Sequence, residues 1–315
     1  MKKNLLGRTG IEVTELCFGA LPMGPLQKNL PVEECADLIS TALAGGVNFI
    51  DTAQGYKTYE PIRLAIKRAK ERPIIASKSP AKSFDEMQKA IDQALNELEL
   101  DYIDIFHLHA ARAGVDVFKK RRGALECLVE NKEKGRIKAV GISTHSAKVT
   151  ELASGLKEID VVFPIINKKG LGILDGNRED MEKAIAKCVS QGKGVYFMKV
   201  LGGGSLVGEF EEAIAYGRSL PGYSSIAIGM VSQEEVEFNL AYFEGEKPKV
   251  FPSVAAMEKR FLVVKSLCAG CFKCVETCPN HAITPKEGKA YIEEEKCLTC
   301  GYCVGACPQF AIRLI

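Results

Sequence analysis

Eight of the twelve cysteines in this 315-residue chain lie between Cys268 and Cys307. They form two runs with one spacing, C-x2-C-x2-C-x3-C-P, and the runs begin 29 residues apart. The stretches CVETCPNHAITP and CVGACPQFAIRL share six of twelve residues, which indicates an internal duplication. Because a block of this size cannot build a sufficient core alone, the cysteines must staple it, and they constrain residues 264–315 more than any other feature.

This spacing is typical of cysteines that hold iron–sulfur clusters. Each C-x2-C-x2-C run supplies three ligands, and the fourth cysteine of the run ligates the other cluster. Zinc sites use four ligands per metal and fit the triple runs poorly. Residues 264–315 resemble the two-cluster bacterial ferredoxins. The predicted ligands of the first [4Fe–4S] cluster are Cys268, Cys271, Cys274 and Cys307, and those of the second are Cys297, Cys300, Cys303 and Cys278.

A secreted disulfide framework is the other way to use so many cysteines. The N-terminal sequence MKKNLLGRTG lacks the apolar segment of a signal peptide, and no apolar run is long enough for a membrane helix. We therefore expect a cytoplasmic protein. A net charge of +2, with 42 basic and 40 acidic residues, gives no reason to expect nucleic acid or a membrane as partner.

The first 245 residues alternate short β-rich runs with helical patterns, eight times in all. Continuous apolar strands such as IDIFHL and VVFPII suit parallel strands that are covered on both faces. Eight such units predict an α/β fold, a (β/α)8 TIM barrel. The alternative is an open doubly wound sheet, but its G-x-G-x-x-G fingerprint is missing. Gly202 and Gly204 could be the first two glycines of that motif, but Val207 stands at the position of the third.

The chain is thus expected to hold a barrel in residues 1–245, a linker in 246–263 and a small α+β dicluster domain in 264–315. The stretch AAMEKRFLVVK in the linker region is compatible with a helix. Even as one helix, residues 243–266 would span about 36 Å, comparable to the height of a barrel. We expect the linker to return the clusters to the barrel mouth, with one of them near Tyr56 and Lys78.

Four chemically distinct side chains lie at the ends of three predicted strands, at the end where barrel enzymes carry their active sites. These are Asp51, Tyr56, Lys78 and His109. An adjacent ammonium favours a phenolate, so Lys78 is expected to lower the pKa of Tyr56, with Asp51 holding the lysine and His109 polarising a carbonyl. One of His107 and His109 is expected to be a core residue on the opposite side of its strand.

Residues 1 to about 245 resemble the aldo-keto reductases, through LGRTG, NFIDTAQGY, the lysine of ASKS, YIDIFHLH and KGRIKAVGIS. The family's catalytic tetrad maps onto the same four residues. The resemblance implies reduction of a carbonyl, or oxidation of an alcohol, with a nicotinamide cofactor and Tyr56 as the general acid.

The positions that would bind the nucleotide match the family less closely. Phe163 and Met198 stand where the family has glutamine and tyrosine, and Glu235 stands where it has the arginine for the adenosine 2′-phosphate. A carboxylate there would repel a phosphate, which argues against NADPH. The candidate cofactor contacts are Ser143, Thr144, Met198, Lys199, Gly229, Ser232 and Asn239.

The sequence thus predicts an oxidoreductase that acts on a small carbonyl compound, with two clusters that transfer electrons. Its nucleotide, NADPH, NADH or neither, is left open, and so is a flavin that would join hydride and one-electron chemistry. One alternative is a reductase fed by a redox protein such as ferredoxin, without nicotinamide. Another is an electron-transfer protein with a non-catalytic barrel, against which the intact tetrad argues.

Overall fold

In a computed structural model of the chain, eight parallel strands close into a barrel. The structure describes residues 1–247, 260–278, 281–294, 297 and 302–315. The strands pair in the order β10-β3-β4-β5-β6-β7-β8-β9. They are β3 (Leu16–Gly19), β4 (Phe49–Asp51), β5 (Ile74–Ser79), β6 (Ile103–Ala110), β7 (Ile137–Thr144), β8 (Val161–Pro164), β9 (Gly194–Met198) and β10 (Tyr223–Ile228). The predicted (β/α)8 barrel is confirmed, because a closed sheet excludes the open alternative.

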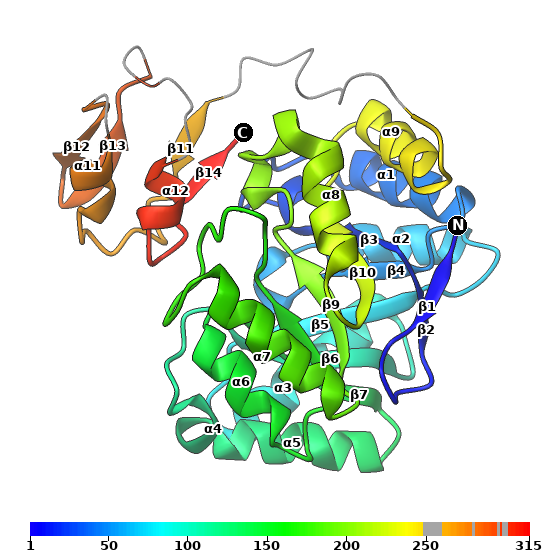
Figure 1. The fold of residues 1–315 in the computed structure, drawn as a ribbon. Helices are drawn as coiled ribbons and strands as arrows, with labels where there is room; N and C mark the ends of the chain where they lie inside the picture. Colours follow the sequence, from blue (N-terminus) through cyan, green and yellow to red (C-terminus); the bar gives the residue numbers. More distant parts are fainter. Residues whose placement is uncertain (248–259, 279–280, 295–296, 298–301) are drawn as a thin grey trace.

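Helices surround the barrel, as Figure 1 shows. They are α1 (Val32–Ala44), α2 (Tyr59–Arg68), α3 (Phe84–Leu98), α4 (Val117–Lys120), α5 (Arg122–Glu133), α6 (Ala147–Ser154), α7 (Arg178–Ser190), α8 (Phe210–Ser219) and α9 (Gln233–Phe243). Local signals set their ends: α3 begins at a capping box in which Ser83 and Glu86 satisfy each other's backbone N–H groups. The hairpin of β1 (Lys3–Leu5) and β2 (Glu12–Thr14) precedes the barrel. Within the described residues, no helix is both apolar enough and long enough to cross a membrane.

The small domain follows the barrel in the chain and is described from residue 260 onward. It contains β11 (Phe261–Val263), α11 (Lys273–Thr277), β12 (Ile283–Lys286), β13 (Lys289–Ile292), α12 (Tyr302–Ala306) and β14 (Ile312–Leu314). Strand β11 pairs antiparallel with β14, and β12 pairs antiparallel with β13. The helix considered for AAMEKRFLVVK is wrong at 261–263, because these residues pair with β14; the rest of the linker at 248–259 lies outside the described residues.

The small domain packs on the barrel end where the parallel strands finish. Figure 1 shows α12 and β14 next to the barrel, with α11, β12 and β13 further out. Phe310 is 2% exposed, and its ring lies 4.9 Å from that of His145, just after β7. Arg112, just after β6, donates from Nη1 to Oε1 of Gln309 at 2.8 Å. These contacts confirm that the chain returns the cysteine domain to the barrel mouth.

Candidate active site and cluster domain

Three members of the predicted tetrad meet around one buried ammonium at the barrel mouth. Lys78, in β5, is 1% exposed, and its Nζ lies 2.6 Å from Oδ1 of Asp51 at the end of β4. The same Nζ donates to the carbonyl of Thr52 at 2.7 Å. It lies 4.8 Å from the ring centroid of Tyr56, which follows β4 in a short 3-10 turn, Gln54–Tyr56. The ion pair therefore fixes a positive charge beside the phenol.

His109 completes the arrangement from β6. Its ring lies edge-on to Tyr56, with the centroids 6.3 Å apart and the planes at 86°. Burial and the charges of Lys78, Arg121 and Arg112 lower the pKa of His109 to about 3. The imidazole is therefore neutral at physiological pH, and it can donate a hydrogen bond without carrying a charge.

Burial raises the pKa of Tyr56, and this contradicts the simple expectation from the sequence. Lys78 does lower the pKa of the phenol through its charge and a hydrogen bond, but loss of solvation outweighs that effect, and Asp51 opposes it. Burial alone would lower the pKa of Lys78 itself, but Asp51 and Tyr56 raise it. Tyr56 thus remains protonated, and Lys78 remains charged, at neutral pH.

His107 lies in the barrel core, as was expected of one histidine, but the reason given was wrong. Residues two apart on a strand share a face, so His107 and His109 occupy successive layers of the interior. Nε2 of His107 lies 2.7 Å from the hydroxyl of Tyr196, which donates to Oδ2 of Asp51 at 3.0 Å. Because Tyr196 gives its one proton to Asp51, His107 donates from Nε2.

Tyr196, in β9, is a site residue that the sequence reasoning missed. It is fully buried and donates to Oδ2 of Asp51, whereas Lys78 donates to Oδ1. Its ring stacks on Phe163 at 3.9 Å with an interplanar angle of 12°. In the sequence it is one aromatic residue in an apolar strand, GVYFM, so only its inward position could have distinguished it.

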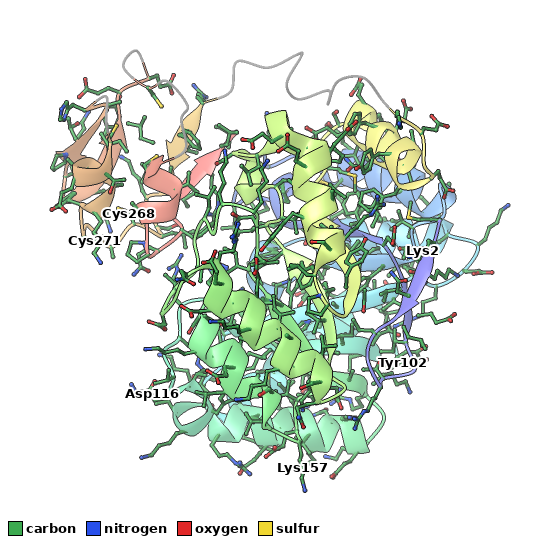
Figure 2. All side chains as sticks on the ribbon, viewed as in Figure 1. Lys2, Tyr102, Asp116, Lys157, Cys268 and Cys271 are labelled. Carbon is green, nitrogen blue, oxygen red and sulfur yellow. The ribbon has the colours of Figure 1, made fainter. Side chains whose placement is uncertain are left out.

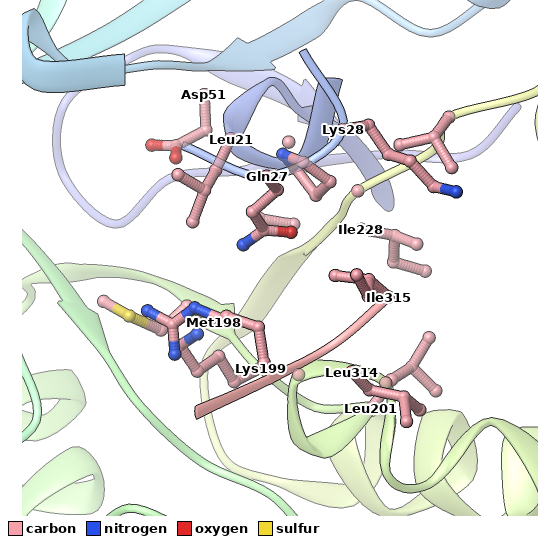
Figure 3. Close-up of a pocket in the computed structure, with 18 of the residues that line it drawn as sticks. Leu21, Gln27, Lys28, Asp51, Met198, Lys199, Leu201, Ile228, Leu314 and Ile315 are labelled. Atoms are coloured by element: carbon pink, nitrogen blue, oxygen red, sulfur yellow. The ribbon is translucent and has the colours of Figure 1, made fainter. Parts of the chain in front are cut away.

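A cavity of about 240 Å³ opens beside the tetrad and is lined from both domains. Asp51, Tyr56, Met198 and Lys199 line it from the barrel, and residues 313–315 line it from the small domain. Figure 3 shows Leu314 and Ile315 in this wall, with Asp51 and Leu21 across the cavity from Met198 and Lys199. The end of β14 therefore forms part of the wall of this cavity.

Some predicted nucleotide contacts come together around this cavity and others do not. Met198, Lys199 and Gly229 line it. Ser143 is fully buried next to His109 in the sheet, and its Oγ has no hydrogen-bond partner among the described residues. Thr144 is buried and accepts from the Ser146 N–H through Oγ1 at 3.1 Å.

The other two predicted contacts serve α9. The Oγ of Ser232 accepts from the Glu235 N–H at 3.3 Å and caps the helix. Asn239 is fully buried and donates from Nδ2 to the Glu235 carbonyl at 2.8 Å. Glu235 itself lines the cavity, is 7% exposed and accepts from the Val231 N–H at 2.9 Å through Oε2. The carboxylate of Glu235 thus already accepts a backbone hydrogen bond at the start of α9.

The cysteine domain brings thiols from both runs together. Burial, together with the neighbouring Cys307 and Cys268, raises the pKa of Cys274 to about 11. Backbone N–H groups point at three sulfurs: Ala290 at Cys268 at 3.5 Å, Ala311 at Cys307 at 3.3 Å, and Ala282 at Cys278 at 3.3 Å. Such hydrogen bonds are a feature of cluster-binding loops.

The remaining cysteines are less closely described. Figure 2 marks Cys268 and Cys271 in the small domain, and Cys271 is exposed. Cys297 is partly buried and Cys303 is buried, while Cys300 lies outside the described residues. Among the described residues, no three His, Cys, Asp or Glu side chains gather as a site for a single metal ion.

The fold and the tetrad define a (β/α)8 oxidoreductase with an appended cysteine domain. The chain belongs to the aldo/keto reductase family, whose model matches residues 15–221, and a model of the 4Fe-4S dicluster domain matches residues 267–312. The predicted fusion is therefore confirmed.

Individual relatives are distant. L-galactose dehydrogenase from Arabidopsis thaliana is 23% identical over 291 residues, covering 75% of this chain and 86% of that protein. An aldo-keto reductase from Bacillus halodurans superposes with a TM-score of 0.64 at 21% identity, over 79% of this chain and 92% of that one. A Bombyx mori aldo-keto reductase in complex with NADP gives 0.57 at 16% identity, over 78% and 88%. At these identities the structures show the fold alone.

Proposed function

We propose that this chain interconverts a carbonyl compound and its alcohol at the barrel mouth, with Tyr56 as the proton donor and two [4Fe–4S] clusters that transfer electrons. The observation that carries the proposal is the buried Lys78–Asp51 ion pair beside Tyr56, with neutral His109 edge-on to the phenol. A barrel used only as a docking scaffold has no need for a charge buried at this cost.

Reduction of a carbonyl adds two electrons and two protons. A bound nicotinamide supplies two electrons and one proton as hydride, whereas a [4Fe–4S] cluster transfers one electron at a time. The carbonyl oxygen takes the second proton from the hydroxyl of Tyr56, and the charge of Lys78 stabilises the phenolate that remains. His109 donates a hydrogen bond that holds the carbonyl oxygen against Tyr56. In the oxidation of an alcohol the same steps run in reverse.

The cysteine domain fits two clusters in the crossed pattern that the spacing predicts. Cys307 of the second run lies close enough to Cys274 of the first run to raise its pKa, which supports Cys268, Cys271, Cys274 and Cys307 as one ligand set. The other set is then Cys297, Cys300, Cys303 and Cys278. Cys307 also lies close enough to influence the pKa of Arg112, just after β6, and of Arg313, which lines the cavity, so the first cluster would lie on the barrel side of the domain.

The residues near the tetrad fit a nicotinamide better than the residues near α9 fit a 2′-phosphate. The unpartnered Oγ of Ser143 is a suitable partner for the carboxamide. At α9, the carboxylate of Glu235 accepts from the Val231 N–H. This carboxylate lies at the N-terminal end of the helix, where the helix dipole would otherwise stabilise a phosphate.

We therefore expect NADH to bind at least as tightly as NADPH. Calorimetry on the full chain with each nucleotide measures this. The Glu235→Gln variant removes the repulsive charge and should raise the affinity for NADPH but not for NADH. Clear preference of the native chain for NADPH would contradict the prediction and would assign the phosphate to Lys199 or Lys28, which also line the cavity.

One observation favours a reductase that is fed by a redox protein and does not use nicotinamide. Arg313, Leu314 and Ile315 line the cavity that a dinucleotide would enter. Anaerobic titration of the cluster-loaded protein with NADH, NADPH and reduced ferredoxin separates the two routes. Cluster bleaching and turnover with ferredoxin alone would establish the second route, and turnover with a nucleotide alone would exclude it.

The rate of carbonyl reduction should be nearly independent of pH between about 5 and 9. The raised pKa of Tyr56 keeps the acid protonated through this range, and His109, with a pKa of about 3, stays neutral throughout it. A pH profile of kcat/KM measures this. A falling limb between about pH 6 and 8 would show that a histidine or an acidified tyrosine controls the reaction.

A further inference from the structure

Arg313 is a cation in the cavity with an unsatisfied donor. It lies in β14 and lines the cavity together with Tyr56, although it belongs to the small domain. Its Nη1 is buried and has no hydrogen-bond partner among the described residues. An unpaired donor on a buried cation is costly, so a ligand that accepts from it would be stabilised.

A second cation faces the same space. Lys199 lines the cavity, and its Nζ lies 4.3 Å from the ring centroid of Phe310; the guanidinium carbon of Arg313 lies 5.1 Å from the same centroid. Phe310 is itself held between the domains by His145, so it positions both cations. Burial and the charge of Arg313 lower the pKa of Lys199, and burial and Arg112 lower the pKa of Arg313, to about 10.

The acidic side chains lining the cavity do not neutralise these cations. Asp51 is paired with Lys78, and Glu235 accepts from the Val231 N–H at the start of α9. The described ion pairs include neither Arg313 nor Lys199. Among the side chains that line the cavity, Arg313 and Lys199 therefore have no carboxylate partner, and they share the cavity with the proposed proton donor.

We propose that Arg313 anchors the carboxylate of an oxo-acid substrate whose carbonyl oxygen lies against Tyr56 and His109. This inference rests on the function proposed above. A guanidinium fork matches a carboxylate with two parallel hydrogen bonds, and Lys199 adds a second basic group whose charged form a bound anion would favour. The oxo acid gains two electrons and two protons and becomes the hydroxy acid; the electrons come from reduced nicotinamide or from clusters recharged by a reduced redox protein. The small domain thus contributes to substrate selection.

Calorimetry with oxamate, a non-reducible isostere of a 2-oxo acid, tests the anchor on the cluster-loaded chain. The native protein should bind oxamate and not its neutral ethyl ester. Arg313→Gln should weaken oxamate binding about 10–100-fold, since a hydrogen bond to a charged group is lost. Arg313→Lys keeps the charge without the fork and should lie between. Arg260→Gln, in the same domain on the exposed Glu294 pair, is the matched control and should change nothing.

Equal binding of oxamate and its ester to the native chain overturns the proposal, and this comparison needs no variant that could misfold. If Arg313→Gln keeps oxamate but loses NADH, the guanidinium holds a dinucleotide phosphate instead. Tyr56→Phe should still bind oxamate, so loss of turnover in that variant tests the proposed chemistry separately from the anchor.

Discussion

Replacing Tyr56 by phenylalanine should lower carbonyl reduction about 10²–10⁴-fold, the usual contribution of a positioned general acid. The ring beside Lys78 and His109 is retained, and only the proton that the carbonyl oxygen needs is removed. Steady-state turnover of the cluster-loaded protein measures the effect, with iron content and circular dichroism to establish that the clusters and the fold are unchanged.

Tyr216→Phe is the matched control for this variant. The hydroxyl of Tyr216 donates to Glu182 at 2.6 Å between two outer helices, α8 and α7, so the same atom is removed far from the tetrad. Turnover of the control should stay close to that of the native chain. Near-normal turnover of Tyr56→Phe would mean that another group gives the proton or that the barrel is not the catalyst.

The barrel could be predicted from the sequence because each element carries its own local signal. In α3, for example, apolar residues recur on one face and Ser83 caps the start of the helix. Asp51, Lys78 and His109 could be placed at one mouth because parallel strands all finish at the same end of a barrel. None of this required knowledge of how distant side chains pack.

What the sequence could not supply depends on burial and on contacts between domains. The pKa of Tyr56 was given the wrong direction because proximity to Lys78 can be inferred from strand ends, whereas the larger cost of desolvation cannot. Arg313 lies beyond the last cysteine and has no motif around it. Its place in the cavity follows only from the docking of Phe310 against the barrel, which the spacing of residues does not encode.

The second large effect is expected on iron content when a single cysteine ligand is replaced, because the fourth ligand of each cluster comes from the other cysteine run. The native chain should carry about eight irons and eight acid-labile sulfides, as two [4Fe–4S] clusters require. Cys307→Ala removes one predicted ligand of the first cluster and should leave about four irons, with loss of the cluster held by Cys268, Cys271 and Cys274. Cys278→Ala should damage the other cluster instead, and Cys35→Ala, in α1 of the barrel, should keep all eight.

Activity then distinguishes an electron path from a structural staple. If the clusters transfer electrons to the mouth, Cys307→Ala should abolish turnover driven by reduced ferredoxin, because the lost cluster is the one whose ligand influences the pKa of Arg313, which lines the cavity. Electron paramagnetic resonance of the reduced variants identifies which cluster remains. Loss of the second cluster in Cys307→Ala and of the first cluster in Cys278→Ala would show that each run ligates its own cluster. Full turnover without the first cluster would instead assign the domain a structural role, in which it holds Phe310 and Arg313 over the barrel.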